Sequence, residues 1–335
     1  MEIFKDYIKN LNKVLDEGNK HGRRARKFLE SGHGISGLPT SGTFSQEKRE
    51  KKEVQLLPSL QEFASTLGVS VDLNQRLGQH PDFANLKSSR NVEQHYIVSM
   101  FIDIKGSTNL FKKYHPGVVQ EITQIIQEVA IHTSLVFGGY VHRLQGDGLF
   151  VYFGGKKTEK KLAVERALQN ACVFTYFVKN DLRKIFNEQG VETIYTRIGI
   201  DFGDDDEVLW FCSGVGEISE VTTCSLHTSL ASKMQNYAES NGVVVGENIK
   251  KFSHPKFFSP ACNRDKSVPR YIFEIPDENY RYTQYDFNWL QYLKIQPFIA
   301  TDQYGNIVLK SKAAIQNPEN IRSIARRNIP YFANK

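Results

Sequence analysis

The chain has 335 residues, of which 40% are hydrophobic and 24% are charged, with a formal net charge of +6. These values are ordinary for a globular protein, and the mild basic excess suits a phosphate-bearing ligand without demanding nucleic acid. The four cysteines form no C-x-x-C pair, which argues against a zinc site. No apolar run approaches the roughly 18 residues of a membrane span. The first residues lack the charged segment followed by an apolar segment that is typical of a signal peptide. We therefore expect a cytoplasmic protein that does not span a membrane.

Three segments precede the main domain in our interpretation. Apolar residues recur at helical spacing over residues 1–30, which predicts an N-terminal helical segment. Residues 31–55 are rich in Gly, Ser and Pro and then in mixed charge, and such a composition buries too little apolar surface to fold, so we predict a flexible linker. Residues 56–94 are predicted to form one short helix and an irregular connector. The basic residues between Lys20 and Lys27 are interpreted as a solvated helix face, with docking of an acidic partner or of RNA as the alternative.

Residues 95–276 are predicted to form one domain. Long helices are expected after residue 108, to about residue 135, and over 161–188, and a shorter helix is expected over 228–240. Strands are expected over 96–104, 140–144, 149–153, 193–201, 207–212, 243–245, 257–259 and 271–275. Because the long helices each precede strands that hairpins join, this order predicts an α+β fold with an antiparallel-rich sheet. Residues 277–335 are assigned to a C-terminal extension with an aromatic cluster and a last helix over 318–327.

The first candidate site lies at the end of the strand over 96–104. Asp103 ends this buried strand, and Gly106-Ser107-Thr108 forms a turn that opens a helix. Backbone N–H groups at a helix start attract phosphate, and a neighbouring carboxylate would hold the Mg²⁺ that accompanies the phosphate. A plain helix cap remains the alternative for this motif alone.

The second candidate site is the hairpin Gln145-Gly146-Asp147-Gly148. Asp-Gly is a favoured turn pair, so this motif alone is also explained by hairpin chemistry. Together, however, Asp103 and Asp147 place one carboxylate on each of two strands that are expected to be neighbours. Two such groups can bridge a pair of divalent ions, which is the arrangement used for in-line displacement at phosphorus.

With these motifs in place, the segment from about Tyr96 to Ile275 resembles the class III adenylate/guanylate cyclase catalytic domain. The resemblance rests on Phe101-Ile-Asp103-Ile-Lys-Gly106-Ser-Thr108, on the Gly146-Asp147 hairpin and on Arg197-Ile-Gly-Ile-Asp-Phe-Gly203. It implies a ferredoxin-like cyclase domain with two Mg²⁺ or Mn²⁺ ions per site. It also implies a homodimer whose composite sites take residues from both subunits.

The resemblance assigns a role to each candidate residue. Asp103 and Asp147 would be the metal ligands, with the carbonyl of Ile104 assisting. Gly106, Ser107, Thr108, Arg197 and Lys266 would hold the phosphates. Ser229 and Lys233 stand where the family has its catalytic Asn and Arg, and Arg143 and Thr222 stand where it has the pair that reads the base. Lys lacks the planar fork of Arg, so Lys233 is not a neutral exchange.

The altered base-reading pair is most similar to that of the Pycsar anti-phage cyclases, which make cyclic UMP or cyclic CMP. Arg143 offers donors only, uracil presents two carbonyl acceptors, and the cytosine amine needs an acceptor. No carboxylate is evident in the sequence to serve that amine, although the Thr222 hydroxyl is available, so UTP is favoured over CTP and both stay open. The product would be read by a separate cyclic-nucleotide effector.

Other functions remain as alternatives to the pyrimidine cyclase. An adenylate or guanylate cyclase would share the fold, and a degenerate nucleotide-binding sensor is suggested by Ser229 and Lys233. A diguanylate-cyclase-like enzyme would need a G-G-D-E/E-F-like hairpin, which Gln145–Gly148 does not supply.

Overall fold

The computed structural model describes residues 1–30, 55–69, 71–261 and 270–310. The expected helix over 318–327, the candidate phosphate ligand Lys266 and almost all of the expected linker lie outside these residues. In the part of the chain that is described, no helix combines the length and the apolar character needed to cross a bilayer.

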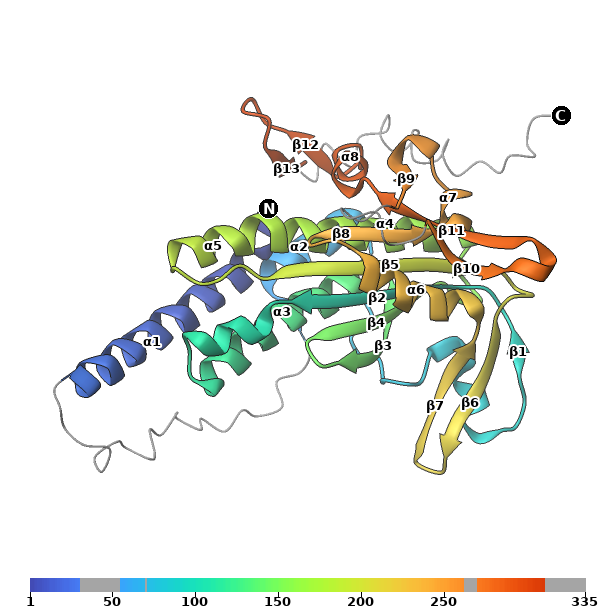
Figure 1. Cartoon of the computed structure of the whole chain (residues 1–335), viewed down its shortest axis with the longest axis horizontal. Helices are drawn as coiled ribbons and strands as arrows, with labels where there is room; N and C mark the ends of the chain where they lie inside the picture. Colours follow the sequence, from blue (N-terminus) through green and yellow to red (C-terminus); the bar gives the residue numbers. More distant parts are fainter. Residues whose placement is uncertain (31–54, 70, 262–269, 311–335) are drawn as a thin grey trace.

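An eight-stranded sheet forms the centre of the molecule (Figure 1). In spatial order its strands are β10 (Tyr271–Ile275), β11 (Tyr280–Phe287), β8 (Gly242–Gly246), β5 (Tyr195–Gly203), β2 (Ile97–Lys105), β4 (Gly148–Phe153) and β3 (Gly139–Gln145), and β9 (Phe258–Pro260) pairs with β11. All of these pairs are antiparallel except β5 with β8. The structure confirms the predicted α+β fold with an antiparallel-rich sheet.

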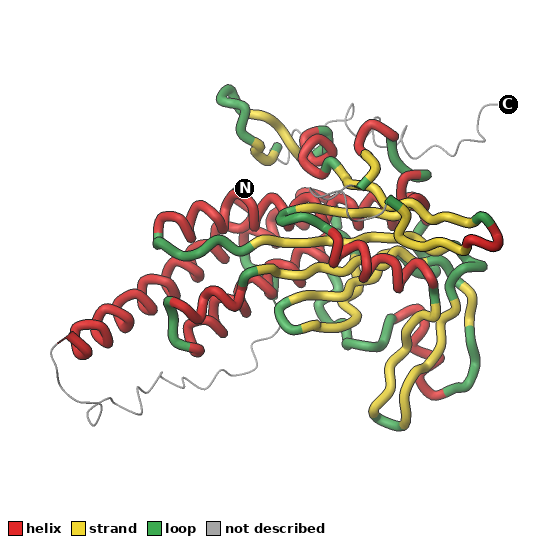
Figure 2. The backbone as a smooth tube through the Cα atoms, viewed as in Figure 1, coloured by secondary structure: helices red, strands yellow, loops and turns green. Residues whose placement is uncertain are grey.

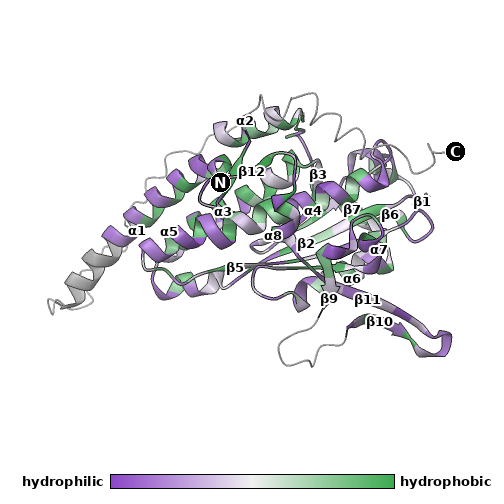
Figure 3. Cartoon of the chain, turned by 90° about the horizontal axis from the view of Figure 1, so that it is seen from above, coloured by the Kyte–Doolittle hydropathy of each residue, from purple (hydrophilic) through white to green (hydrophobic). Residues whose placement is uncertain are grey.

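A layer of helices covers one face of this sheet, as the view from above shows (Figure 3). It contains η1 (Glu2–Phe4), α1 (Lys5–Glu30), α2 (Pro58–Leu67), α3 (Pro116–Val136), α4 (Lys160–Tyr176), the π-helical turn η5 (Phe177–Leu182) and α5 (Arg183–Glu188). Side chains alternate along β2, so that Ile102 and Ile104 are buried in the core that these helices share with the sheet. Phe101 belongs to a separate core on the opposite face.

That opposite face carries α6 (Leu226–Tyr237), which packs on β2, β5 and β8. A hairpin of β6 (Leu209–Val215) and β7 (Ile218–Cys224) projects from the molecule beside β1 (Glu93–Gln94) and η3 (Pro81–Ser88) (Figure 2). Aromatic side chains hold the hairpin to the main sheet, for example Trp210 on β6, which lies 5.1 Å from Tyr152 on β4 between ring centroids. The hairpin is therefore anchored at its base by a buried core.

The sheet continues beyond residue 276, where we placed the start of a C-terminal extension. β11 follows the short helix η7 (Pro276–Glu278) and pairs with β8 inside the sheet. α8 (Trp289–Lys294) then packs against α4, and the Trp289 indole donates a hydrogen bond to the Asn241 carbonyl (3.0 Å). The small hairpin of β12 (Ile299–Thr301) and β13 (Ile307–Leu309) completes the described chain, with α7 (Glu247–Lys250) and η6 (Pro255–Phe257) on the loops before β9.

Candidate active site

Asp103 lies at the carboxyl end of β2, on the face opposite the helical layer. Its neighbours in the strand, Ile102 and Ile104, are buried in the helix-side core, so alternation turns the Asp103 side chain the other way. The chain then leaves the sheet through Gly106, whose φ of 93° is a conformation that suits glycine, and enters η4 (Ser107–Lys112). The local sequence thus places a carboxylate directly beside a tight turn.

Asp147 lies beside the end of β2 because the β3–β4 hairpin packs against that strand. Ile102 is paired with Leu149, and a Cβ on Gly148 would lie only 2.4 Å from the Ile102 carbonyl oxygen. Only a glycine lets the hairpin approach so closely, and Gly146 turns the hairpin with a φ of 62°. The expected juxtaposition of the Asp103 and Asp147 strand ends is present in the sheet.

The Asp147 carboxylate has an unsatisfied oxygen. Its Oδ2 atom is buried and has no hydrogen-bond partner in the described part of the chain. A buried carboxylate oxygen without a donor is costly unless a cation or a proton satisfies it. The carboxylate oxygens of Asp103 and Asp147 and the Ile104 carbonyl are of the type that a hard divalent cation prefers. No group of three or more His, Cys, Asp or Glu side chains that could hold a metal ion gathers in the described chain.

Arg197 pairs with Asp103 across β2 and β5. The two residues are directly opposite in the register, and the Arg197 Nε and Nη2 atoms lie 3.1 Å and 2.5 Å from Asp103 Oδ2. We expect Arg197 to hold phosphate, and in this structure its guanidinium forms an ion pair with Asp103. Both side chains are partly exposed, at 24% and 31%, so solvent and ligands reach the pair.

A hollow of about 530 Å³ opens beside Asp147 and the turn after β2. Its lining includes Ser107, Thr108, Gly146 and Asp147, together with three glutamines on α3 that our sequence analysis missed: Gln120, Gln124 and Gln127. The Gln127 amide donates a hydrogen bond to the Gly146 carbonyl (3.0 Å), which ties α3 to the hairpin. Their spacing along α3 places these amides on one helix face. The sequence shows this spacing, but it indicates a site only once the β3–β4 hairpin is known to pack against that face.

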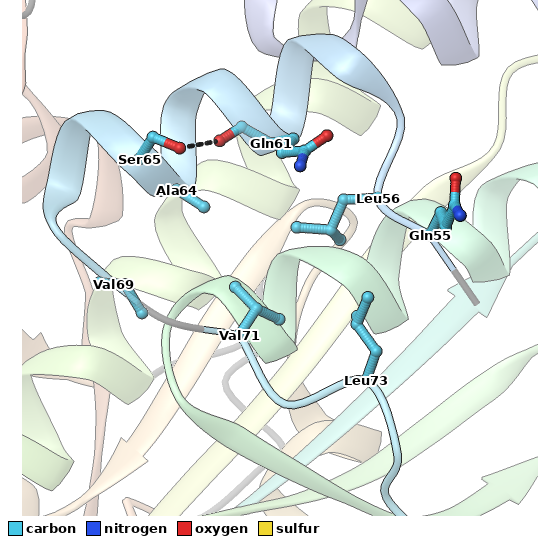
Figure 4. A pocket seen from close by; sticks show the side chains of 8 residues that line it. All are labelled: Gln55, Leu56, Gln61, Ala64, Ser65, Val69, Val71 and Leu73. Carbon is cyan, nitrogen blue, oxygen red and sulfur yellow. Dashed lines mark hydrogen bonds between the residues drawn. The ribbon is translucent and has the colours of Figure 1, made fainter. Parts of the chain in front are cut away.

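A second hollow, of about 430 Å³, lies between α2 and the segment that follows it (Figure 4). It is lined by Gln55, Leu56, Gln61, Ala64, Ser65, Val69, Val71 and Leu73. None of these residues is charged, so this hollow offers no carboxylate ligand for a cation and no cationic group for a phosphate.

Of the expected base-reading residues, Arg143 lies on β3 and Thr222 on β7, and Arg143 contacts an unexpected carboxylate, Glu220, two residues before Thr222. Arg143 Nε donates to Glu220 Oε2 (2.6 Å), and its Nη2 forms a second ion pair with Oε1 of the same carboxylate. Glu220 and Thr222 alternate along β7 and therefore share one of its faces. Thr222 is 9% exposed, and its hydroxyl lies 3.5 Å from the Tyr152 hydroxyl.

Ser229 and Lys233 lie four residues apart on the solvent-exposed face of α6. Within the described residues, neither side chain forms a hydrogen bond or an ion pair with Asp103 or Asp147. The helix itself is tightly seated, because a Cβ on Gly199 of β5 would lie 2.1 Å from the Ala231 carbonyl oxygen. Both side chains are accessible from solvent.

A buried ionic network fixes the start of α6. His227 Nδ1 lies 2.9 Å from Asp201 Oδ2, and Tyr282 donates to the other carboxylate oxygen (2.8 Å). Burial lowers the pKa of His227, but the hydrogen bond and charge of Asp201, together with Glu207, outweigh it and raise this pKa above the usual value of 6.5. The contact between His227 and Asp201 therefore ties the start of α6 to the sheet.

Comparisons with known proteins show which proteins the chain is similar to. No family model matches the chain. A curated cytidylate cyclase from Staphylococcus aureus is 38% identical over 252 residues, which cover 73% of this chain and 59% of that protein. A cytidylate cyclase from Escherichia coli is 32% identical over 235 residues, which cover 68% and 51%. The chain thus spans about half the length of the curated relatives it matches. These matches confirm the resemblance to pyrimidine nucleotidyl cyclases.

Two solved structures are similar at lower identity. The adenylyl cyclase CyaB from P. aeruginosa has a TM-score of 0.49 and 16% identity, over 59% of this chain and 95% of that chain. The guanylyl cyclase Cya2 has a TM-score of 0.46 and 15% identity, over 58% and 92%.

The His227 network generates a pH-dependence prediction. A pKa that is raised in the folded state contributes stability that is present below the unfolded value and is lost as the pH rises through the folded value. The urea midpoint of the protein should therefore fall as the pH rises from 6.5, the usual histidine value, through the raised pKa of His227. His227→Gln should show a smaller fall over the same interval. An equal fall in both proteins would contradict the assignment of this charge to His227.

Proposed function

We propose that the chain is a pyrimidine nucleotidyl cyclase that converts CTP or UTP to the 3′,5′-cyclic nucleotide and pyrophosphate. The observation that carries the proposal is the buried, unpartnered Oδ2 atom of Asp147 beside the strand end that bears Asp103. The curated relatives are named cytidylate cyclases, which favours CTP over the UTP that Arg143 alone favoured. As the resemblance implies, the product would signal through a separate effector in anti-phage defence.

The chain's own residues supply binding and orientation. Asp103 and Asp147 hold the cations, and the Gly106–Thr108 turn with its adjoining hollow receives the phosphates. When two Mg²⁺ or Mn²⁺ ions are bound, they supply the positive charge that favours ionisation of the substrate 3′-hydroxyl and departure of pyrophosphate. When Arg197 is released from Asp103, its planar guanidinium becomes free to bind a phosphate through two donors. The 3′-oxygen forms its bond to the α-phosphorus as the bond to the β-phosphate oxygen breaks, so no protein nucleophile is needed.

The active form is proposed to be a homodimer with two composite sites. Ser229 and Lys233 are exposed on α6, and within the described residues they do not contact the candidate metal ligands of their own chain. A second copy that presents this face of α6 would bring Lys233 to the α-phosphate, where a cation stabilises the developing charge. The Ser229 hydroxyl would approach the ribose.

A nucleotide-binding sensor without turnover is the second candidate function. It is favoured by the ion pair between Arg197 and Asp103, which occupies a candidate metal ligand. Incubating the protein with each of the four nucleoside triphosphates and Mn²⁺, followed by mass spectrometry, distinguishes the two functions. The cyclase predicts a cyclic pyrimidine nucleotide, and the sensor predicts unchanged triphosphate in every reaction.

Isosteric removal of each carboxylate charge tests the metal ligands. Asp103→Asn and Asp147→Asn should each lower the rate of cyclization about 1,000-fold or more, because the charge that binds the cations is lost while the side-chain shape is kept. The rate of cyclic nucleotide formation measures this effect. Asp277→Asn, at an exposed position on η7, serves as the matched control and should retain full activity. Activity close to that of the unaltered protein in either test variant would contradict the two-metal assignment.

Complementation tests the composite site. Asp147→Asn and Lys233→Ala should each be inactive alone, because each removes one half of both sites in a symmetric dimer. Co-expressed in equal amounts, they should recover about a quarter of the original activity, since half the dimers are mixed and each mixed dimer has one intact site. No recovery in mixed dimers, isolated through two different affinity tags, would contradict the assignment of these residues to different subunits.

A further inference from the structure

Arg143 and Glu220 form a donor–acceptor pair that the assigned roles do not explain. They come from strands far apart in the sequence, separated by 77 residues, and meet through two contacts on the same carboxylate. Gly78 permits this meeting, because a Cβ there would lie 2.8 Å from the Glu220 Cβ. The β3–β4 register shifts between Val141 and Arg143, and such a bulge re-aims the side chains next to it.

One side of the Arg143–Glu220 pair lies against a buried histidine, and the other side is exposed to solvent. The His142 side chain is fully buried, neither ring nitrogen has a hydrogen-bond partner in the described chain, and its Nε2 lies 3.7 Å from Glu220 Oε2. Burial, with Arg143 and His80, lowers the pKa of His142 to about 3, so the ring is neutral and keeps one N–H. By contrast, the side chains of Arg143 and Glu220 are 43% and 23% exposed. A ligand can therefore reach the pair from the solvent side while His142 backs the carboxylate.

The donors and acceptors that Arg143 and Glu220 leave free follow a fixed order along their exposed edge. The Arg143 guanidinium has five N–H donors, of which two are directed at Glu220, so its outer edge keeps two neighbouring donors. Each Glu220 carboxylate oxygen has lone pairs beyond those that Arg143 occupies. The exposed edge thus presents two donors followed by an acceptor.

We propose that Arg143 and Glu220 together read the Watson–Crick edge of cytosine. This inference rests on the proposed cyclase function and names its substrate as CTP. Arg143 donates to the cytosine O2 and N3 acceptors, and Glu220 accepts from the 4-amino group.

Uracil does not match this order of donors and acceptors. Its N3 carries a hydrogen and its position 4 is a carbonyl oxygen, so in the same pose an Arg143 donor faces the N3–H and the Glu220 carboxylate faces O4. A site built around buried or partly buried polar groups discriminates strongly when a ligand leaves them unpaired. Glu220 is the carboxylate that the sequence did not reveal, and its presence reverses the preference for UTP that Arg143 alone implied.

Glu220→Gln tests the proposal by replacing one carboxylate oxygen with an amide donor of nearly the same shape. The full-length protein should have a higher kcat/KM for CTP than for UTP, and the variant should show a fall of about 10- to 100-fold in this ratio, mostly through loss of CTP turnover. Glu217→Gln, at an exposed position near the tip of the same hairpin, is the matched control and should keep the original ratio.

Each outcome separates this inference from the proposed function. A CTP preference that Glu220→Gln leaves intact overturns the role of Glu220 and leaves the cyclase standing. A preference for UTP in the unaltered protein overturns the cytosine assignment alone. No cyclic product from any triphosphate, with the thermal unfolding midpoint unchanged across the variants, overturns the proposed function itself.

Discussion

The close packing of the β3–β4 hairpin against the end of β2 is the constraint on which the proposed chemistry depends. Gly148 has no room for a side chain beside the Ile102 carbonyl, and this contact brings Asp147 to the strand end that carries Asp103. Two carboxylates at one edge repel each other unless positive charge compensates them. Arg197 provides part of that compensation, and the unpartnered oxygen of Asp147 leaves room for more.

The two functional halves of the chain are held by different kinds of interaction. The candidate metal ligands lie on β2 and the β3–β4 hairpin, whose position follows from backbone pairing within the sheet. The residues proposed for the partner site, Ser229 and Lys233, lie on α6, which the contact between Asp201 and His227 ties to the sheet. A dimeric cyclase would need both attachments to be rigid, because each site would combine residues from the two halves.

Local sequence signals predicted the carboxylates, while long-range packing determined the rest of the site. Asp103 and Asp147 were identifiable because each stands at a strand end next to glycines. Glu220 was missed because its importance comes from a contact with Arg143 across 77 residues, which depends on how the β6–β7 hairpin folds back on the sheet. Likewise, the aromatic residues of β11 suggested a separate extension, and only the pairing of β11 with β8 shows that this segment belongs to the central sheet.

A crystal structure of the protein soaked with Mn²⁺ and a non-cyclizable CTP analogue tests the central claim most directly, because anomalous scattering locates the ions. The account predicts two manganese peaks within coordination distance of the Asp103 and Asp147 carboxylates, with Arg197 turned from Asp103 to a phosphate. Bound nucleotide with an intact Arg197–Asp103 ion pair and no manganese at Asp147 would contradict it.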